Sequence, residues 1–247
     1  MHDLHIKVAA VESRLGAVTT TAERNRKAIT LLAVSKTRSA AHVQQAAESG
    51  IKSFGENYLQ EALEKMADLQ PLELDWHFIG PIQSNKTRQI SENFAWVHSV
   101  DRVKIAKRLS DQRPLAMGPL NICMQINIDN EPTKSGFSVE QAVAAALEIL
   151  VLPNLKLRGL MAIPAAQASI DAQRIPFAKL RELKDRINRS LDNSEKLDTL
   201  SMGMSSDLEA AILEQATIVR VGTDIFGPRD TKSVSYTHLT LPTSTTV

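Results

Sequence analysis

Residues 30–57 of the chain read TLLAVSKTRSAAHVQQAAESGIKSFGEN and contain one strand–helix–strand unit. The unit opens on a continuous apolar run, Leu31–Val34, as expected of a strand that is buried on both faces. A helical pattern over Ala40–Ser49 separates this run from a second β-type segment, Ser53–Asn57. A strand, a helix and a strand in this order predict two parallel strands joined by a crossover.

The same alternation extends over most of the chain. The predicted strands are Thr30–Lys36, Ser53–Asn57, Trp76–Gly80, Trp96–Val100, Asn121–Ile128, Leu157–Ile163, Thr199–Met202 and Ile218–Gly222. The predicted helices are an opening helix from about Leu4 to Lys27, then Ala40–Ser49, Tyr58–Leu69, Asp101–Leu109, Val139–Val151, Asp171–Asn188 and Leu208–Gln215. Eight strands in about 230 residues match an α/β fold, a single (β/α)8 TIM-type barrel, here with an extra N-terminal helix. An open doubly wound sheet is the alternative, but no Gly-x-Gly-x-x-Gly turn follows the first strand.

Two of the predicted helices carry a capping box at their start. Ser138-x-x-Gln141 and Ser206-x-x-Glu209 each place a hydroxyl three residues before an amide or carboxylate side chain. In a capping box the two side chains satisfy unpaired amides of the first helical turn. Both motifs therefore mark a residue at which we expect a helix to begin.

Residues 233–247 differ in composition from the rest of the chain. They include no Asp, Glu, Lys or Arg, are rich in serine and threonine, and over Val234–Thr243 resemble a translated sequencing adapter. We interpret 233–247 as a non-native tail that replaces the natural C-terminus, with a disordered natural tail as the alternative. Tyr236 and His238 are therefore given no chemical role. No repeat or linker divides residues 1–232, which we expect to form one domain.

Composition and charge exclude several classes of protein. With 29 Lys and Arg against 28 Asp and Glu, the net charge of +1 gives no indication of a nucleic-acid or acidic-membrane partner. The lone cysteine, Cys123, excludes an internal disulfide framework or multi-cysteine metal site, and its apolar surroundings predict a buried thiol. No stretch approaches the ~18 apolar residues of a membrane span, and the first residues are too polar for a secretory signal. We expect a cytoplasmic protein without a bound metal.

Lys36 ends the first predicted strand, where the working residues of a barrel lie. Because side chains alternate along a strand, Lys36 shares a face with Val34 and is expected to project into the barrel mouth. A lysine partly removed from water loses ammonium character and becomes an amine nucleophile toward an aldehyde. On position alone, a surface lysine is an equally good interpretation.

The segments after the seventh and eighth strands indicate a phosphate site. Ser201–Asp207 (SMGMSSD) and Val221–Gly227 (VGTDIFG) occupy positions where barrels often bind phosphate, next to a helix N-terminus. Glycine permits close backbone approach, and the hydroxyls of Ser201 and Thr223 can complete an oxygen shell. Glycine with serine more often means only a turn, but a phosphate site facing a lysine suits a phosphorylated cofactor that carries an aldehyde.

Arg220 shares a strand face with Gly222 and is expected to point into the same mouth. An arginine beside a pyridine nitrogen would keep that nitrogen unprotonated, because two cationic groups in contact repel each other. The ring would then be a poor electron sink, unsuited to most carbanion chemistry. The alternative is an outward Arg220 paired with a helix carboxylate.

Seven motifs spread over the chain are similar to those of one known family. They are AVSK (33–36), FGENYLQE (54–61), WHFIGPIQSNK (76–86), KSG (134–136), RGLM (158–161), MGMSSD (202–207) and RVGTDIFG (220–227). On these motifs the chain, from Met1 to about Lys232, resembles the pyridoxal phosphate homeostasis proteins, which are related in fold to the barrel domain of alanine racemase. Chance agreement over so many motifs is negligible.

The resemblance implies a cofactor and roles for the candidate residues. Lys36 would form a Schiff base with pyridoxal 5'-phosphate. Ser201, Gly222 and Thr223 would hold the phosphate. Arg220 would lie beside the pyridine nitrogen.

Two further residues, Asn57 and His77, would lie around the cofactor ring by the same resemblance. By itself His77 is more typical of a hydrogen-bonded core histidine, and Asn57 can equally cap a helix that starts at Tyr58. The chain departs from the family at Asp224, where many relatives carry a small apolar residue. A carboxylate beside a phosphate would be repulsive, so we expect Asp224 to face outward.

Two functional classes are compatible with this resemblance. The first is a carrier that binds pyridoxal phosphate reversibly, limits free aldehyde and releases the cofactor to acceptor apo-enzymes. The second is an amino-acid racemase, which requires a base on each face of the substrate, one of which can be Lys36. In racemases of this fold the opposing base is a tyrosine on a second domain of a partner chain, whereas here the barrel consumes the sequence and Tyr58 is the only tyrosine before residue 233. We favour a non-enzymatic carrier, as a monomer or weak dimer.

Overall fold

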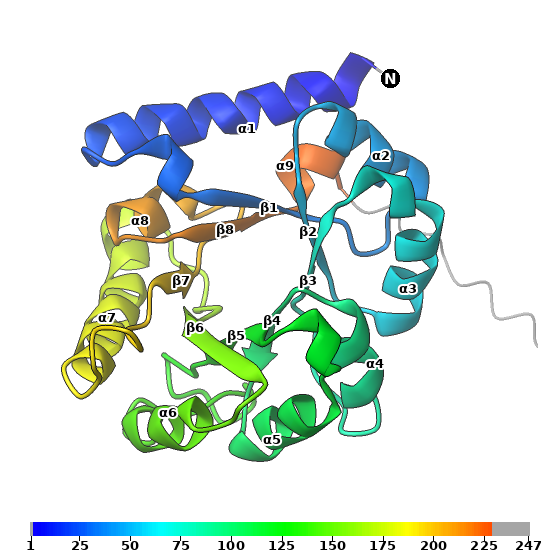
Figure 1. The fold of residues 1–247 in the computed structure, drawn as a ribbon. Helices are drawn as coiled ribbons and strands as arrows, with labels where there is room; N and C mark the ends of the chain where they lie inside the picture. Colours follow the sequence, from blue (N-terminus) through cyan, green and yellow to red (C-terminus); the bar gives the residue numbers. More distant parts are fainter. Residues whose placement is uncertain (1, 229–247) are drawn as a thin grey trace, which may run out of the picture.

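Eight parallel strands form a closed barrel in chain order in the computed structural model, which describes residues 2–228. Figure 1 shows the strands as a central ring surrounded by helices. The strands are β1 Thr30–Val34, β2 Ser53–Glu56, β3 Asp75–Phe78, β4 Trp96–Val100, β5 Leu120–Gln125, β6 Leu155–Met161, β7 Thr199–Ser201 and β8 Ile218–Val221. Because β8 pairs with β1, the predicted barrel is confirmed and the open sheet is excluded.

Helices cover the outside of the barrel. They are α1 His2–Thr21, α2 Ala40–Glu48, α3 Leu59–Asp68, α4 Thr87–Asn93, α5 Val103–Gln112, α6 Ala142–Leu150, α7 Ile170–Asn188, α8 Leu208–Leu213 and α9 Thr223–Phe226. Short 3-10 turns occur at Arg26–Ala28, Gln70–Leu72 and Leu115–Met117. The extra N-terminal helix α1 packs against α8 and α9 (Figure 1). None of the helices within residues 2–228 is both long and apolar enough to cross a membrane.

Several boundaries differ from the predicted ones. The opening helix ends at Thr21 rather than Lys27, because Glu23 adopts a left-handed φ of 51° and Asn25 caps the following 3-10 turn. Strand β1 ends at Val34, so that Lys36 lies in the turn after the strand and not on it. The proposed tail, 233–247, falls outside the described residues.

The first predicted capping box forms its two hydrogen bonds but does not mark the start of the helix, because α6 begins at Ala142 with Gln141 as its capping residue. At the first, the amide of Gln141 donates to Ser138 Oγ at 3.3 Å and the amide of Ser138 donates to Gln141 Oε1 at 3.4 Å. The second, at Ser206, is wrong because the Glu209 carboxylate instead accepts hydrogen bonds from Arg14 of α1. A long-range ion pair has replaced the local contact.

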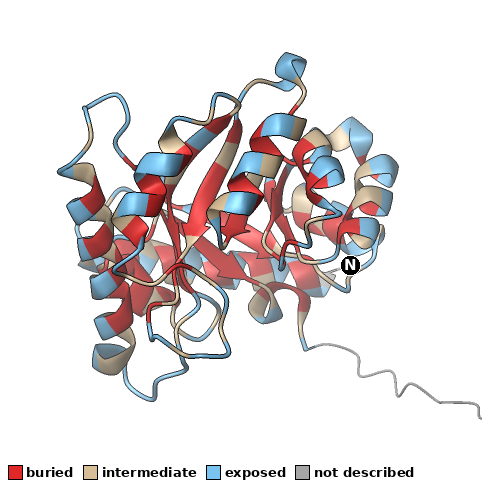
Figure 2. Ribbon diagram, turned by 90° about the horizontal axis from the view of Figure 1, so that it is seen from below, coloured by how far each residue is buried: buried red, intermediate tan, exposed pale blue. Residues whose placement is uncertain are grey.

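The core has two layers of different character. Figure 2 shows buried residues along the strands and on the inward faces of the helices. Between strands and helices most buried side chains are apolar, among them Phe54, Phe94 and Phe177. Polar side chains are buried too, including His98 and Arg220, which lie in β4 and β8. One of these buried polar side chains, Arg220, also lines the cavity described below.

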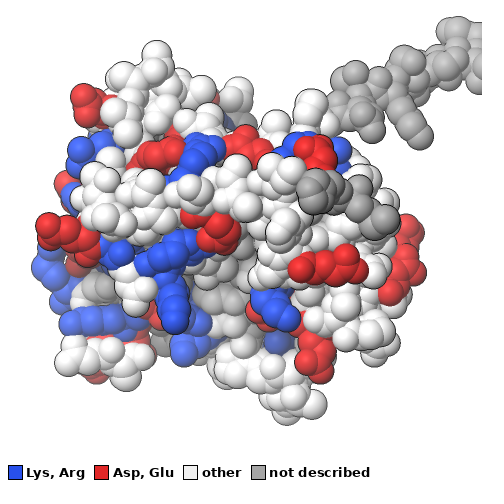
Figure 3. All heavy atoms as spheres, turned by 90° about the horizontal axis from the view of Figure 1, so that it is seen from above, with Lys and Arg blue, Asp and Glu red and all other residues white. Residues whose placement is uncertain are grey.

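The outer surface carries charges of both signs. On the face that includes α1, Lys and Arg side chains are interspersed with Asp and Glu (Figure 3). Ion pairs such as Arg26–Glu12, at 2.8 Å, account for part of this pattern. The view therefore agrees with a net charge near zero and with no single-sign field over this face.

Gly159 in β6 provides a test of strand packing. A Cβ at this position would lie 1.8 Å from the Thr199 carbonyl oxygen of β7, whereas a Cβ at Gly16 in α1 meets no atom within 4 Å. We expect Gly159→Ala to lower the free energy of unfolding by about 1–3 kcal/mol. Gly16→Ala, the control, should raise it by about 0.5–1 kcal/mol because alanine favours the helix. Urea unfolding measures both, and equal stabilities would contradict the packing described.

Candidate functional site

A cavity of about 490 Å³ opens where the barrel strands end. This volume lies within the ~300–1,000 Å³ that is usual for sites of small ligands. Five predicted site residues line the cavity, and these are Lys36, Asn57, Arg220, Gly222 and Thr223. The other two, His77 and Ser201, do not line it.

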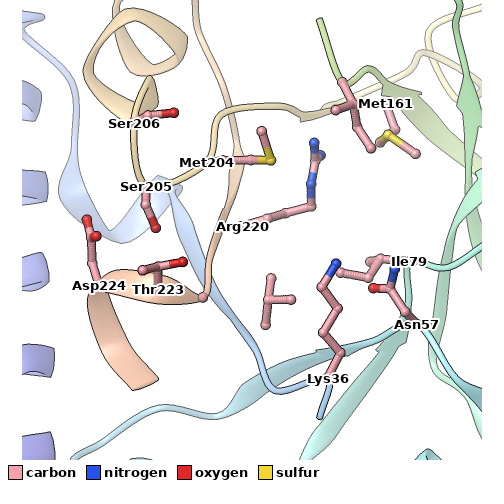
Figure 4. A pocket seen from close by; sticks show the side chains of 13 residues that line it. Lys36, Asn57, Ile79, Met161, Met204, Ser205, Ser206, Arg220, Thr223 and Asp224 are labelled. Carbon is pink, nitrogen blue, oxygen red and sulfur yellow. The ribbon is translucent and has the colours of Figure 1, made fainter. Parts of the chain in front are cut away.

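Lys36 enters the cavity from the turn that follows β1. Its half-buried side chain lines the cavity together with Val34, as the sequence predicts. Figure 4 shows the amine directed into the space near Ile79 and Arg220. The alternative of an ordinary surface lysine is therefore excluded.

Hydroxyl groups line the opposite side of the cavity. Ser205 and Ser206, in the loop after β7, join Thr223 at the start of α9. Figure 4 shows the Ser205 and Thr223 side chains close together, across the cavity from Lys36. The predicted loops thus meet, but the loop after β7 contributes Ser205 and Ser206 in place of Ser201.

Arg14 of α1 connects the two loops that form this hydroxyl-lined wall. Its guanidinium donates to Glu209 at 2.9 Å, to the Ser205 carbonyl oxygen at 3.1 Å and to Asp224 at 2.5 Å. The Asp224 carboxylate is thereby held by a cation of α1, but Asp224 also lines the cavity, so the predicted outward orientation holds only for its ion pair. Sequence reasoning missed Arg14, because no motif links a residue of the first helix to loops about two hundred positions later.

Arg220 is buried beneath the cavity and points inward. Its Nη1 donates to the Ser201 carbonyl oxygen at 2.6 Å and to Ser201 Oγ at 2.7 Å, and its Nη2 donates to the Ala162 carbonyl oxygen at 2.9 Å. The outward alternative is therefore wrong. Burial lowers the pKa of Arg220 to about 10, so that the guanidinium is cationic at neutral pH.

The Ser201 hydroxyl belongs to a buried hydrogen-bonded chain. It lies 2.7 Å from His98 Nδ1, and His98 Nε2 lies 2.9 Å from His77 Nδ1. His77 also stacks on Trp96, with 5.5 Å between ring centroids. The Ser201 hydroxyl thus bonds to His98 and Arg220, and Ser201 does not line the cavity. His77 has the core position that its sequence context favours. Sequence reasoning missed His98, because a single histidine in β4 matches no motif.

The two histidines of this hydrogen-bonded chain, His77 and His98, are neutral. Burial lowers the pKa of His77 to about 3. The pKa of His98 is lowered well below its ordinary value, first by burial and then by His77 and the Arg220 cation. A neutral imidazole has one donor and one acceptor nitrogen, which suits a chain of hydrogen bonds next to a fixed charge.

Asn57 contributes a polar atom without a partner. Its Oδ1 is buried and accepts no hydrogen bond, although the residue lines the cavity. Asn57 does not cap α3, whose capping residue is Tyr58 with no side-chain bond. Because unpaired buried acceptors are rare, this oxygen indicates a place for a ligand donor.

A second cavity of about 300 Å³ adjoins the first and shares Asn57, Ile79 and Ile163 with it. Lys134, from the KSG motif, lines this second cavity. Its amine pairs with Glu131 at 2.6 Å and donates to the Ile163 carbonyl oxygen at 3.3 Å. The two cavities together extend the barrel mouth past Lys36.

Cys123 is buried, as its apolar surroundings predict. Burial raises the pKa of its thiol to about 12, so it is not a nucleophile at neutral pH. Within residues 2–228, no group of three or more His, Cys, Asp or Glu side chains can hold a metal ion.

A parallel eight-stranded barrel with a lysine after β1 and hydroxyl-bearing loops after β7 and β8 defines a barrel of the alanine racemase type. The family model "Alanine racemase, N-terminal domain" matches residues 6–230. An alanine racemase structure from Clostridium difficile 630 superposes with a TM-score of 0.67 at 13% identity, covering 94% of this chain and 58% of that chain. At such low identity the likeness shows the fold alone.

Similarity to more closely related proteins narrows this class. The curated pyridoxal phosphate homeostasis protein of Pseudomonas aeruginosa is 56% identical over 223 residues, which cover 90% of this chain and 94% of that protein. The one from Escherichia coli K12 is 45% identical, covering 93% and 98%. A structure of PipY from Synechococcus elongatus PCC7942 with PLP bound has a TM-score of 0.80 at 33% identity, covering 91% and 100%. The chain belongs to the family of pyridoxal phosphate homeostasis proteins.

The buried histidines make stability depend on pH. The pKa of His77 is about 3 in the folded protein against an ordinary value of 6.5, so the unfolded chain binds more protons between these values. We expect the free energy of unfolding to fall as the pH drops below about 6.5, by about 1.4 kcal/mol per pH unit for one such histidine. Urea unfolding of wild type and His77→Phe between about pH 7 and pH 5 should give a shallower dependence for the variant. An identical slope would contradict the neutral buried state.

Proposed function

We propose that this protein holds pyridoxal 5'-phosphate reversibly through Lys36 and acts in homeostasis of the cofactor inside the cell. The observation that carries the proposal is one cavity with a half-buried amine on one side and a hydroxyl-lined wall on the other. When bound, the cofactor supplies an aldehyde, which forms a C=N bond with a primary amine and releases water. The PLP-bound relative PipY, at 33% identity, supports the same ligand.

Each side of the cavity fits one part of the cofactor. The amine of Lys36 is the anchor for the aldehyde. Ser205 and Thr223, with the backbone at Gly222, fit the phosphate, since hydroxyls and close backbone approach suit its oxygens. The unpaired Oδ1 of Asn57 fits a donor on the ring. Ser201 bonds to Arg220 and His77 bonds to His98, and neither residue lines the cavity.

Arg220 supports a carrier in preference to a catalyst. Its charge, with three acceptors already in place, would keep a neighbouring pyridine nitrogen unprotonated and limit carbanion chemistry. Tyr58, the only tyrosine among the described residues, is 55% exposed and does not line the cavity. Residues 2–228 therefore offer no tyrosine opposite Lys36 for racemisation.

The proposal extends to partners and location. The oligomeric state that we propose is a monomer or weak dimer. The adjoining second cavity gives an incoming amine, such as that of an acceptor apo-enzyme, space beside Lys36. The single, buried cysteine suits the reducing cytoplasm.

Borohydride reduction tests the anchor. In protein loaded with one equivalent of cofactor, reduction should fix the label to the peptide that contains Lys36. Lys36→Ala should bind at least about tenfold more weakly but retain affinity through the hydroxyl-lined wall, since a tenfold loss is about 1.4 kcal/mol. The exposed Lys27→Ala is the control and should match wild type. Label found mainly on other peptides of the wild-type protein would refute the assignment.

A racemase assay over common amino acids separates the two functional classes. We expect no turnover above the low side activity of a protein-bound cofactor, because within residues 2–228 no tyrosine lines the cavity opposite Lys36. Saturable turnover in the range of about 1–10³ per second would overturn the carrier function. Transfer of cofactor to an apo-enzyme, followed by recovery of that enzyme's activity, measures the favoured function directly.

A further inference from the structure

A second lysine, Lys65 of α3, lies buried beneath the turn that carries Lys36. Only 4% of Lys65 is exposed. Its amine donates to the Ser35 carbonyl oxygen at 2.7 Å, to Glu56 Oε1 at 2.7 Å and to Glu61 Oε1 at 2.6 Å. An ammonium group has three protons to donate, so every donor of Lys65 has an acceptor.

This cluster contacts the backbone on both sides of Lys36. The Ser35 carbonyl oxygen, in the peptide group before Lys36, accepts from Lys65. The Thr37 amide, in the peptide group after Lys36, donates to Glu61 Oε1 at 2.6 Å. Because the flanking peptide planes determine the direction of the Cα–Cβ bond, one ion pair fixes the direction in which the Lys36 side chain leaves the chain.

Thr37 shows that this turn needs support. Its φ is +64°, a left-handed conformation that a β-branched residue rarely adopts. Such a conformation costs on the order of 1–3 kcal/mol and persists only where surrounding contacts hold it. The bond from the Thr37 amide to Glu61 is such a contact.

Glu56 completes the cluster from β2. It is fully buried, and its Oε1 accepts from Ser35 Oγ at 2.6 Å as well as from Lys65. Burial raises the pKa of Glu56, while Lys65 and Ser35 oppose that effect. The side chain of Ser35 is thus fixed along with its backbone.

We propose that Lys65, Glu56 and Glu61 are positioning residues for Lys36. They hold the peptide groups around Lys36 so that its amine enters the cavity, and they withhold the fully bonded Lys65 amine from aldehydes. The proposal deepens the function proposed above and rests on Lys36 being the anchor.

Glu61 offers the sharpest test because its side chain is 29% exposed, so that its replacement leaves the barrel folded. Glu61→Ala removes the acceptor for the Thr37 amide, whereas Glu61→Gln keeps an oxygen at the same place. Glu64→Ala is the matched control, since Glu64 lies on the same helix and bonds only to exposed Gln60 in α3.

The first readout uses the cofactor-free protein. Amide hydrogen exchange at Thr37, followed by NMR, should accelerate at least about tenfold in Glu61→Ala, because a bond to a charged acceptor is lost. Glu61→Gln should stay within about threefold of wild type, because a neutral oxygen still accepts the bond. Glu64→Ala should match wild type.

The second readout is the formation of the bond between the aldehyde and Lys36. Attachment at a fixed cofactor concentration, trapped by borohydride and mapped by peptide, should slow about tenfold in Glu61→Ala and recover in Glu61→Gln. Lys65→Met should give the same loss with no label at residue 65; if that variant does not fold, Glu61→Ala decides.

The outcomes separate this inference from the proposed function. Equal exchange at Thr37 and equal attachment in Glu61→Ala and Glu64→Ala would overturn the positioning role. Absence of attachment at Lys36 in the wild-type protein would overturn the proposed function instead. Label on Lys65 in wild type would contradict the withholding of its amine.

Discussion

The burial of one positive charge organises the interior of this barrel. Arg220 is almost completely buried and interacts with two carbonyl oxygens and a hydroxyl, and no carboxylate within residues 2–228 forms an ion pair with it. A buried charge is tolerated only when its donors are satisfied, which constrains the ends of β6 and β7 that supply those acceptors. The same constraint explains why the next groups along, His98 and His77, are neutral: another cation at this depth would have no compensation. The floor of the cavity therefore has a fixed charge and a fixed shape.

Two lysines in the same region illustrate how environment assigns chemistry. Lys65 is almost completely buried among three oxygens, so that its protons are all engaged. Lys36, twenty-nine residues earlier, is half-buried and lines the cavity. The first behaves as a structural cation and the second has the access that a nucleophile needs. Neither the charge of the two lysines nor their distance from the barrel mouth would be enough to assign them these different roles.

The alternation of apolar runs with helical patterns was sufficient to predict the barrel, because parallel strands and short crossovers admit few other closed arrangements. It also brought Lys36 and the Gly222–Thr223 turn to one end, since the carboxyl ends of parallel strands share a rim. What sequence could not provide was the side-chain orientation of Ser201, which is set by partners in β4 and β8 that are distant in the chain. For the same reason the contacts of Arg14 were missed. Helix α4, Thr87–Asn93, was not predicted from the sequence. This helix is short and largely polar, and it has too few apolar positions for a helical periodicity to be visible.

The position of Arg14 has a consequence for the growing polypeptide. Helix α1 leaves the ribosome first, yet its arginine bonds to Ser205, Glu209 and Asp224, which are made about two hundred residues later. The region that carries Lys36 and its ionic cluster is complete by the end of α3. A nascent chain thus exposes a potential anchor amine for most of translation without the loops that would retain a phosphorylated aldehyde. The hydroxyl-lined wall opposite Lys36 is therefore complete only after Thr223 has been added to the chain.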